Sequence, residues 1–174
     1  MIRELTLTRG KDIADLLTWS RVFLAIVIFF AALTGQKSLL SFVIAMIVIG
    51  WTTDVLDGKL ARSDASDKKT WIGNHDFVAD MSMSYAGMFY FMTSGYLPFW
   101  PFFLYGIYSL TVALIWLNKS YVMAVAAPVS AMPVIFALIY SRFMALVFIA
   151  WIIASLISQW GRFKEEIKEF VEGV

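Results

Sequence analysis

Long apolar segments alternate with short polar ones along this chain. Each apolar segment is about 20 residues long, the length of a helix that crosses a bilayer. Windows of apolar sequence predict six transmembrane helices, at Leu16–Leu33, Leu39–Leu56, Phe77–Ser94, Phe99–Leu117, Val122–Tyr140 and Phe143–Gln159. The predicted fold class is therefore all-α, a polytopic membrane protein, and we expect residues 1–174 to form a single membrane domain.

Both ends of the chain have amphipathic patterns. Ile13 and Leu16 indicate a short N-terminal interfacial helix that leads into the first span. In Arg162–Val174 the apolar residues, among them Phe163 and Ile167, fall on one helical face with Lys and Glu elsewhere. We expect this segment to be a C-terminal amphipathic helix that lies against the membrane surface.

The composition supports a membrane protein and excludes several chemistries. The chain is 60% hydrophobic and 16% charged, whereas soluble domains are about 45–50% apolar and about 25% charged. It has no cysteine and a single histidine, His75, which excludes disulfides, thiolate chemistry and a multi-histidine zinc site. Its net charge of +1 gives no reason to expect nucleic-acid binding.

The basic residues predict the orientation in the membrane. Lys37 and Arg142 fall on the side opposite the termini, and all other Lys and Arg residues fall on the side of the termini. An excess of Lys and Arg marks the cytoplasmic side. We therefore expect a multi-pass protein of the cell membrane, with both termini and the loop from Lys59 to His75 in the cytoplasm.

Four aspartates fall at helical spacing beside this loop. Asp54 and Asp57 lie at i and i+3, and Asp76 and Asp80 lie at i and i+4, so each pair shares one face of its helix. Adjacent helices could bring the four carboxylates together, and cations must then neutralise them. Oxygen ligands alone favour Mg²⁺, Mn²⁺ or Ca²⁺. Two such ions form the clamp used for in-line displacement at phosphorus.

Small and basic residues accompany these aspartates. Gly58 and Ala61 remove bulk beside the carboxylates, and Arg62 adds a donor fork that suits phosphate. The pattern predicts a site for a metal-bound pyrophosphate at the membrane surface. Arg21, in the first span, is interpreted as an interface anchor whose charge reaches the headgroups, with contact to phosphate as the alternative.

The segment Asp54-Val-Leu-Asp57-Gly58-Lys-Leu-Ala-Arg resembles the signature D-x-x-D-G-x-x-A-R of the CDP-alcohol phosphotransferase family. Asp76 and Asp80 match the two aspartates of its second half, G-x-x-x-D-x-x-x-D. The spacer is longer than in the family pattern, and Gly73 stands closer to Asp76 than that pattern has it. Thr70 lies three residues before this glycine, as in some members.

This resemblance implies a transfer reaction of phospholipid biosynthesis. A phosphoalcohol group would pass from a CDP-linked lipid donor, usually CDP-diacylglycerol, to a small alcohol acceptor, with release of CMP. The resemblance implies two divalent cations, Mg²⁺ or Mn²⁺, on Asp54, Asp57, Asp76 and Asp80, with Asp80 also taking the proton of the acceptor. The residues that it assigns to the CDP moiety are Gly58, Ala61, Arg62, Thr70, Thr18 and Asp15. A homodimer is also expected from the resemblance.

Two other functions stay open at this point. One is a catalytically inactive relative that acts as a binding protein, and the other is a cation transporter that depends on aspartates. A transporter would place acidic residues near the middle of the bilayer, whereas all four aspartates lie at one edge of their predicted helices. The sequence leaves the acceptor alcohol open, and also the ester or ether linkage of the donor lipid.

Overall fold

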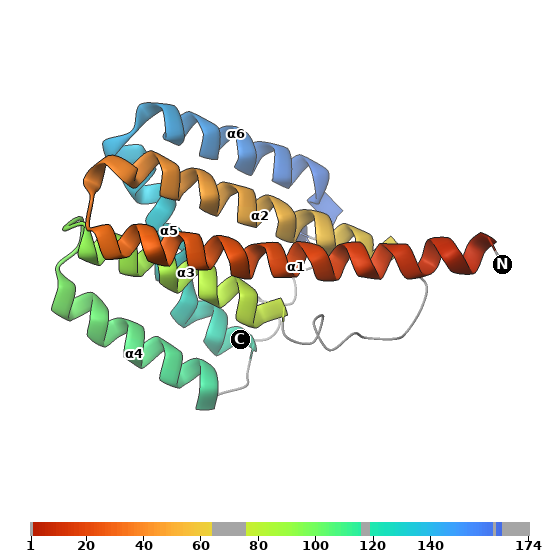
Figure 1. Cartoon of the computed structure of the whole chain (residues 1–174), viewed down its shortest axis with the longest axis horizontal. Coiled ribbons are helices and arrows are strands. Elements are labelled where there is room, and N and C mark those ends of the chain that lie inside the picture. The colour runs from red at the N-terminus through yellow and green to blue at the C-terminus, as the bar shows by residue number, and fades with distance from the viewer. Residues whose placement is uncertain (1, 64–75, 116–118, 162, 165–174) are drawn as a thin grey trace. The chain divides into compact units, whose positions relative to one another are not determined.

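The computed structural model describes residues 2–63, 76–115, 119–161 and 163–164, with side chains at 13–59, 78–112, 115, 124–161 and 163–164. Every regular element in these ranges is helical, which confirms the all-α fold class (Figure 1). The elements in chain order are α1 (Ile2–Thr34), the 3₁₀ turn η1 (Lys37–Leu39), α2 (Leu40–Ser63), α3 (Asp76–Thr93), α4 (Phe99–Ile115), α5 (Lys119–Tyr140) and α6 (Arg142–Ser158).

The helix positions agree closely with those predicted from the apolar windows, with two differences. Helix α2 continues past the predicted end at Leu56 to Ser63, and the N-terminus also differs. The interfacial helix expected before the first span is not a separate element, because α1 is continuous from Ile2 to Thr34. This segment contains no proline that would interrupt its hydrogen bonds. The expected C-terminal amphipathic helix falls mainly on residues 165–174, which lie outside the described residues.

Two described segments, Ile13–Thr34 and Lys37–Lys59, are long and apolar enough to cross a membrane. Three further segments are apolar but shorter, namely Phe99–Val112, Ala124–Tyr140 and Arg142–Ser158. The predicted count of six transmembrane helices is therefore not confirmed.

The chain divides into two compact units, Met1–Ile107 and Tyr108–Val174, which are considered separately. In the first unit α1 packs against both α2 and α3 (Figure 1). At its N-terminal end α1 continues beyond both of these helices, so only part of its length is packed between them (Figure 1). The three helices supply most of the apolar core of this unit, which includes Ile28, Ile44 and Phe91.

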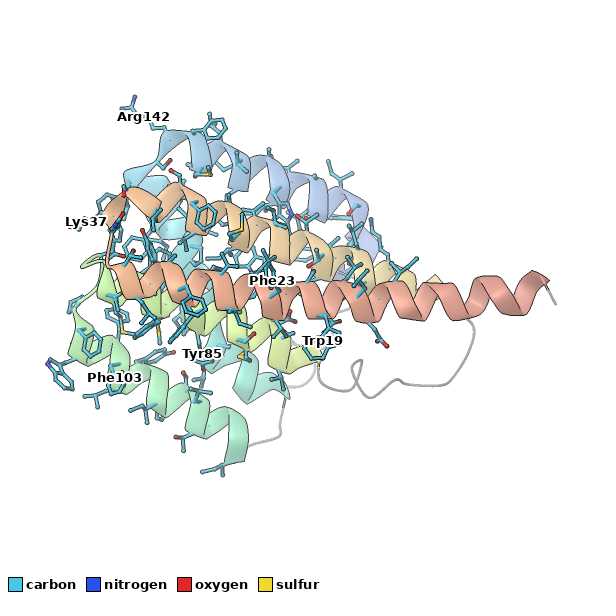
Figure 2. The ribbon with its side chains drawn as sticks, in the orientation of Figure 1. Trp19, Phe23, Lys37, Tyr85, Phe103 and Arg142 are labelled. Atoms are coloured by element: carbon cyan, nitrogen blue, oxygen red, sulfur yellow. The ribbon has the colours of Figure 1, made fainter. Side chains whose placement is uncertain are left out.

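The two faces of α1 differ in the side chains that they present. Its outward face exposes large apolar side chains at helical spacing: Trp19, Phe23, Ile26, Phe30 and Leu33 (Figure 2). Its buried face holds mostly small or polar side chains, Thr18, Arg21, Ala25 and Ala32, together with the large apolar Ile28. Because a helix in water turns its apolar stripe inward, this inverted pattern favours a lipid-exposed outer surface.

Close packing of α2 on α3 depends on a glycine. A Cβ atom at Gly50 would lie 2.2 Å from the Sδ atom of Met83, a side chain that is fully buried. Only a residue without a Cβ atom lets the two helices approach this closely without moving Met83.

The end of the unit opposite Trp19, marked by Lys37 in Figure 2, is held by turns and tyrosine hydrogen bonds. Gly35 ends α1 with a φ of 63°, in the left-handed region that suits glycine. The hydroxyl of Tyr90 on α3 donates to the carbonyl oxygen of Gln36 at 2.9 Å. The hydroxyl of Tyr96 donates to the carbonyl oxygen of Lys37 at 3.2 Å. These contacts fix the C-terminal end of α3 against the α1–α2 connection.

In the second unit α5 and α6 pack together as a helix pair with a single residue between them. That residue, Ser141, caps α6, since its side-chain oxygen accepts a hydrogen bond from the backbone N–H of Met144 at 3.4 Å. Helix α5 runs through both Pro128 and Pro133. Residues 116–118, which precede it, lie outside the described residues.

Candidate active site

Arg21 lies on the buried face of α1, one helical turn after Thr18. Its side chain is 1% exposed, the largest fully buried side chain among the described residues. A guanidinium is charged at every physiological pH, and burying it without a counter-charge costs several kcal/mol. The stretch of α1 that holds it lies between Trp19 and Phe23, both labelled in Figure 2.

Three carboxylates from two helices supply the counter-charge to Arg21. On α2, Asp54 Oδ1 lies 2.9 Å from Nη1 of Arg21, and Asp57 Oδ2 is paired with Nη2. On α3, Asp80 Oδ1 is paired with Nη1. One guanidinium therefore joins α1 to α2 and to α3, and the aspartates from both halves of the sequence motif meet at a single point.

Thr18 completes the buried part of this cluster. Its hydroxyl oxygen accepts a hydrogen bond from Nη2 of Arg21 at 3.2 Å. The hydroxyl lies 3.4 Å from Asp57 Oδ2 and 3.3 Å from the carbonyl oxygen of Ala14, and it can donate to either. Thr18 and Asp57 are buried, so this side of the cluster faces the packed interior of the first unit.

The other two carboxylates open the cluster to the surroundings. The side chains of Asp54 and Asp80 are 46% and 41% exposed, against 7% for Asp57. Arg21 brings one positive charge to the three carboxylates that it contacts. A cationic partner that approaches from the surroundings would meet Asp54 and Asp80 first.

No group of three or more His, Asp or Glu side chains among the described residues is arranged to hold a metal ion. Instead, Arg21 engages Asp54, Asp57 and Asp80. The donor set nevertheless fits Mg²⁺ or Mn²⁺, because it consists of carboxylate oxygens that already converge on one cation.

The remaining residues predicted for the site lie around this cluster along the chain. Gly58 directly follows Asp57 on α2, and Asp15 lies on α1 one turn before Thr18. Asp76 is the first residue of α3, one turn before Asp80. The side chains of Ala61, Arg62 and Asp76 and the whole of Thr70 lie outside the described residues.

The prediction that Arg21 is an interface anchor is wrong, because an anchor would extend its charge towards the lipid headgroups. Its guanidinium turns inward and meets Asp54, Asp57 and Asp80 instead. A signal for this was present in the sequence. Thr18 and Arg21 stand at i and i+3 on one face, and a cluster of four aspartates needs a positive charge close by.

The sequence of the chain was compared with known families, curated proteins and solved structures. The family model described as CDP-alcohol phosphatidyltransferase matches residues 11–163, a range that contains Arg21 and both aspartate pairs. The chain therefore belongs to the CDP-alcohol phosphatidyltransferase family, a family of transferases that act on CDP-alcohol donors and alcohol acceptors. No curated protein and no solved structure is significantly similar to it.

Proposed function

We propose that this protein transfers a phosphoalcohol group from a CDP-linked lipid donor to a small alcohol acceptor and releases CMP, as a step of phospholipid biosynthesis. The observation that carries the proposal is the meeting of Asp54, Asp57 and Asp80 at one point, with two of the three carboxylates half-exposed. Membership of the CDP-alcohol phosphatidyltransferase family supports it independently.

In the proposed reaction one bond forms and one bond breaks at a single phosphorus of the donor. The acceptor hydroxyl oxygen attacks the phosphorus that bears the lipid alcohol, and the proton of the hydroxyl passes to the carboxylate of Asp80. The bond between this phosphorus and the bridging oxygen then breaks, and CMP leaves with the electron pair. Asp80 suits the role because its half-exposed carboxylate lies at the open side of the cluster.

The proposal assigns two Mg²⁺ or Mn²⁺ ions to Asp54, Asp57, Asp76 and Asp80. Such ions, when bound, neutralise the pyrophosphate and polarise the phosphorus under attack. Gly58, Ala61 and Arg62 would bind the CDP moiety, with Thr18, Asp15 and Thr70 beside it. Thr18 and Asp57 already lie in contact, which places a predicted nucleotide contact beside a predicted metal ligand.

The proposed setting is a membrane, with the site on its cytoplasmic side and a homodimer as the proposed assembly. The lipid-exposed face of α1 supports the membrane setting, since Trp19, Phe23 and Phe30 are exposed on it. A lipid donor could then reach the site from the bilayer, while a soluble acceptor enters from the aqueous side.

An assay of CMP release tests the proposal. Purified protein with CDP-diacylglycerol and a panel of alcohols, including glycerol phosphate, inositol phosphate, inositol and serine, should release CMP with at least one acceptor. Asp57→Asn should abolish the release, whereas Asp67→Asn, the same change in the loop predicted to be cytoplasmic, should retain it. Donor binding without CMP release under all conditions would favour the inactive relative and contradict the proposed transfer.

A further inference from the structure

We propose that Arg21 is a built-in counter-cation that sets the metal affinity of the aspartate cluster, defined as Asp54, Asp57 and Asp80. In the structure Arg21 holds the three carboxylates together, and we expect it to yield carboxylate oxygens to a divalent cation that binds there. The inference rests on the proposed function, because it takes these aspartates as metal ligands.

The burial of Arg21 supports this role. Its side chain is 1% exposed, so water does not solvate the guanidinium, and Arg21 cannot leave the cluster by moving to the surface without repacking α1. The cluster thus contains a permanent positive charge. Because guanidinium groups keep their proton at all physiological pH values, this charge is present whether or not a metal is bound.

The contacts of Arg21 make it a competitor for the same carboxylates. Nη1 is shared between Asp54 Oδ1 and Asp80 Oδ1, and Nη2 is shared between Asp57 Oδ2 and the Thr18 hydroxyl. A divalent cation held by these aspartates needs oxygens of the same carboxylates, and it is repelled by the guanidinium beside them. Each cation therefore weakens the binding of the other.

The same contacts make Arg21 a positioning residue for the metal-free state. Without it, three carboxylates from α2 and α3 would face one another in a partly buried site and repel. Arg21 joins both helices to α1, so the arrangement of the ligands survives when no metal is present. Its removal should weaken the metal-free fold and strengthen metal binding at the same time.

The test compares Mn²⁺ binding and thermal unfolding in the purified full-length wild-type protein and the Arg21→Gln variant. We expect Arg21→Gln to bind Mn²⁺ at least about tenfold more tightly, because one repelling charge is removed from beside the ion. We also expect its melting temperature to be lower than that of wild type without metal, and to rise more on addition of MnCl₂.

Two further variants sharpen the test. Arg21→Lys keeps the charge but not the planar fork, so its Mn²⁺ affinity should lie between those of wild type and Arg21→Gln. Arg142→Gln makes the same charge change at an exposed residue and should bind Mn²⁺ as wild type does. If Arg21→Gln fails to fold in buffer, it should fold when prepared with Mn²⁺ throughout, since the ion supplies the missing charge.

The outcomes separate this inference from the proposed function. Equal or weaker Mn²⁺ binding by Arg21→Gln than by wild type would overturn the inference and leave the proposed transferase intact. Failure of Arg21→Gln to fold even in Mn²⁺ would also overturn it, because Arg21 would then have a structural role that the ion does not replace. If neither protein binds Mn²⁺, both the inference and the proposed metal site are wrong.

Discussion

At the scale of single residues, the carboxylates of the cluster differ in exposure and therefore in their expected roles. Asp57 is buried against Thr18 and Arg21, whereas Asp54 and Asp80 are half-exposed. A buried carboxylate suits a permanent ligand, and a half-exposed one can meet a substrate that enters from outside. Exposure therefore separates Asp57, which suits a permanent ligand, from Asp54 and Asp80, which a substrate can reach.

The residue scale yields a prediction about metal dependence. CMP release should require Mg²⁺ or Mn²⁺, and Asp54→Asn or Asp57→Asn should abolish it, because each substitution removes a negative ligand from a site built of carboxylates. Removal of metal with excess chelator, followed by its return, should abolish and then restore the release. CMP release that continues in excess chelator would contradict the metal site.

At the same scale, the sequence predicts part of the site and misses part of it. The positions of Asp54 and Asp57 on one helix, and of Asp80 on the next, follow from helical spacing alone. The burial of Arg21 does not, since periodicity places a residue on a face without showing which helices will cover that face. Its contacts depend on the packing of α1 between α2 and α3.

At the scale of elements, the apolar windows predict helix positions well because turns and polar residues end each window. Gly35, directly after α1, and Gly95, which follows α3 with Ser94 between, both adopt positive φ angles, as expected for glycines near helix ends. The unbroken course of α1 from Ile2 to Thr34 was missed, because its first part is polar and has no apolar window. The backbone hydrogen bonds of the helix form in this first part even though its side chains are polar.

The turn at Gly35 provides the prediction at this scale. Gly35→Ala should lower the free energy of unfolding by about 1–2 kcal/mol, since its φ of 63° is disfavoured for residues with a Cβ atom. The new Cβ atom would also lie 3.4 Å from the carbonyl oxygen of Thr93. The comparison is made by denaturant unfolding of the detergent-solubilised protein.

A matched control is available at Gly161, where an added Cβ atom would have no neighbour within 4 Å. Gly161→Ala should therefore leave the free energy of unfolding unchanged or slightly raise it. Equal losses for both alanine variants would mean that the Gly35 turn makes no special contribution to the stability of the first unit.

At the scale of the whole molecule, the sequence predicts membrane spans and an orientation, and the structure tests only part of this prediction. Two described segments meet the length and apolarity of a membrane span, and the inverted faces of α1 support a lipid environment. The orientation depends on the distribution of Lys and Arg between the loops, several of which lie outside the described residues. It therefore stays a prediction.

Labelling of single cysteines tests the orientation, because the chain contains none of its own. In intact cells, a cysteine at Ser66 should be protected from an impermeant thiol reagent, and it should react once the cytoplasmic side is opened. Ser38→Cys, at an exposed residue in the connection after α1, should react from outside. Labelling of Ser66→Cys in intact cells would place the aspartate cluster on the outer side.

The central claim is that the aspartate cluster performs a group transfer, and Asp80→Asn tests it most directly. Turnover measured as CMP release and donor affinity measured by binding of CDP-diacylglycerol should be compared in wild type, Asp80→Asn and Asp54→Asn. We predict that Asp80→Asn lowers turnover by about 10²- to 10⁴-fold, the usual contribution of a general base, while donor binding weakens far less than in Asp54→Asn. Near-normal turnover in Asp80→Asn, or a loss of donor binding as complete as in Asp54→Asn, would contradict the account.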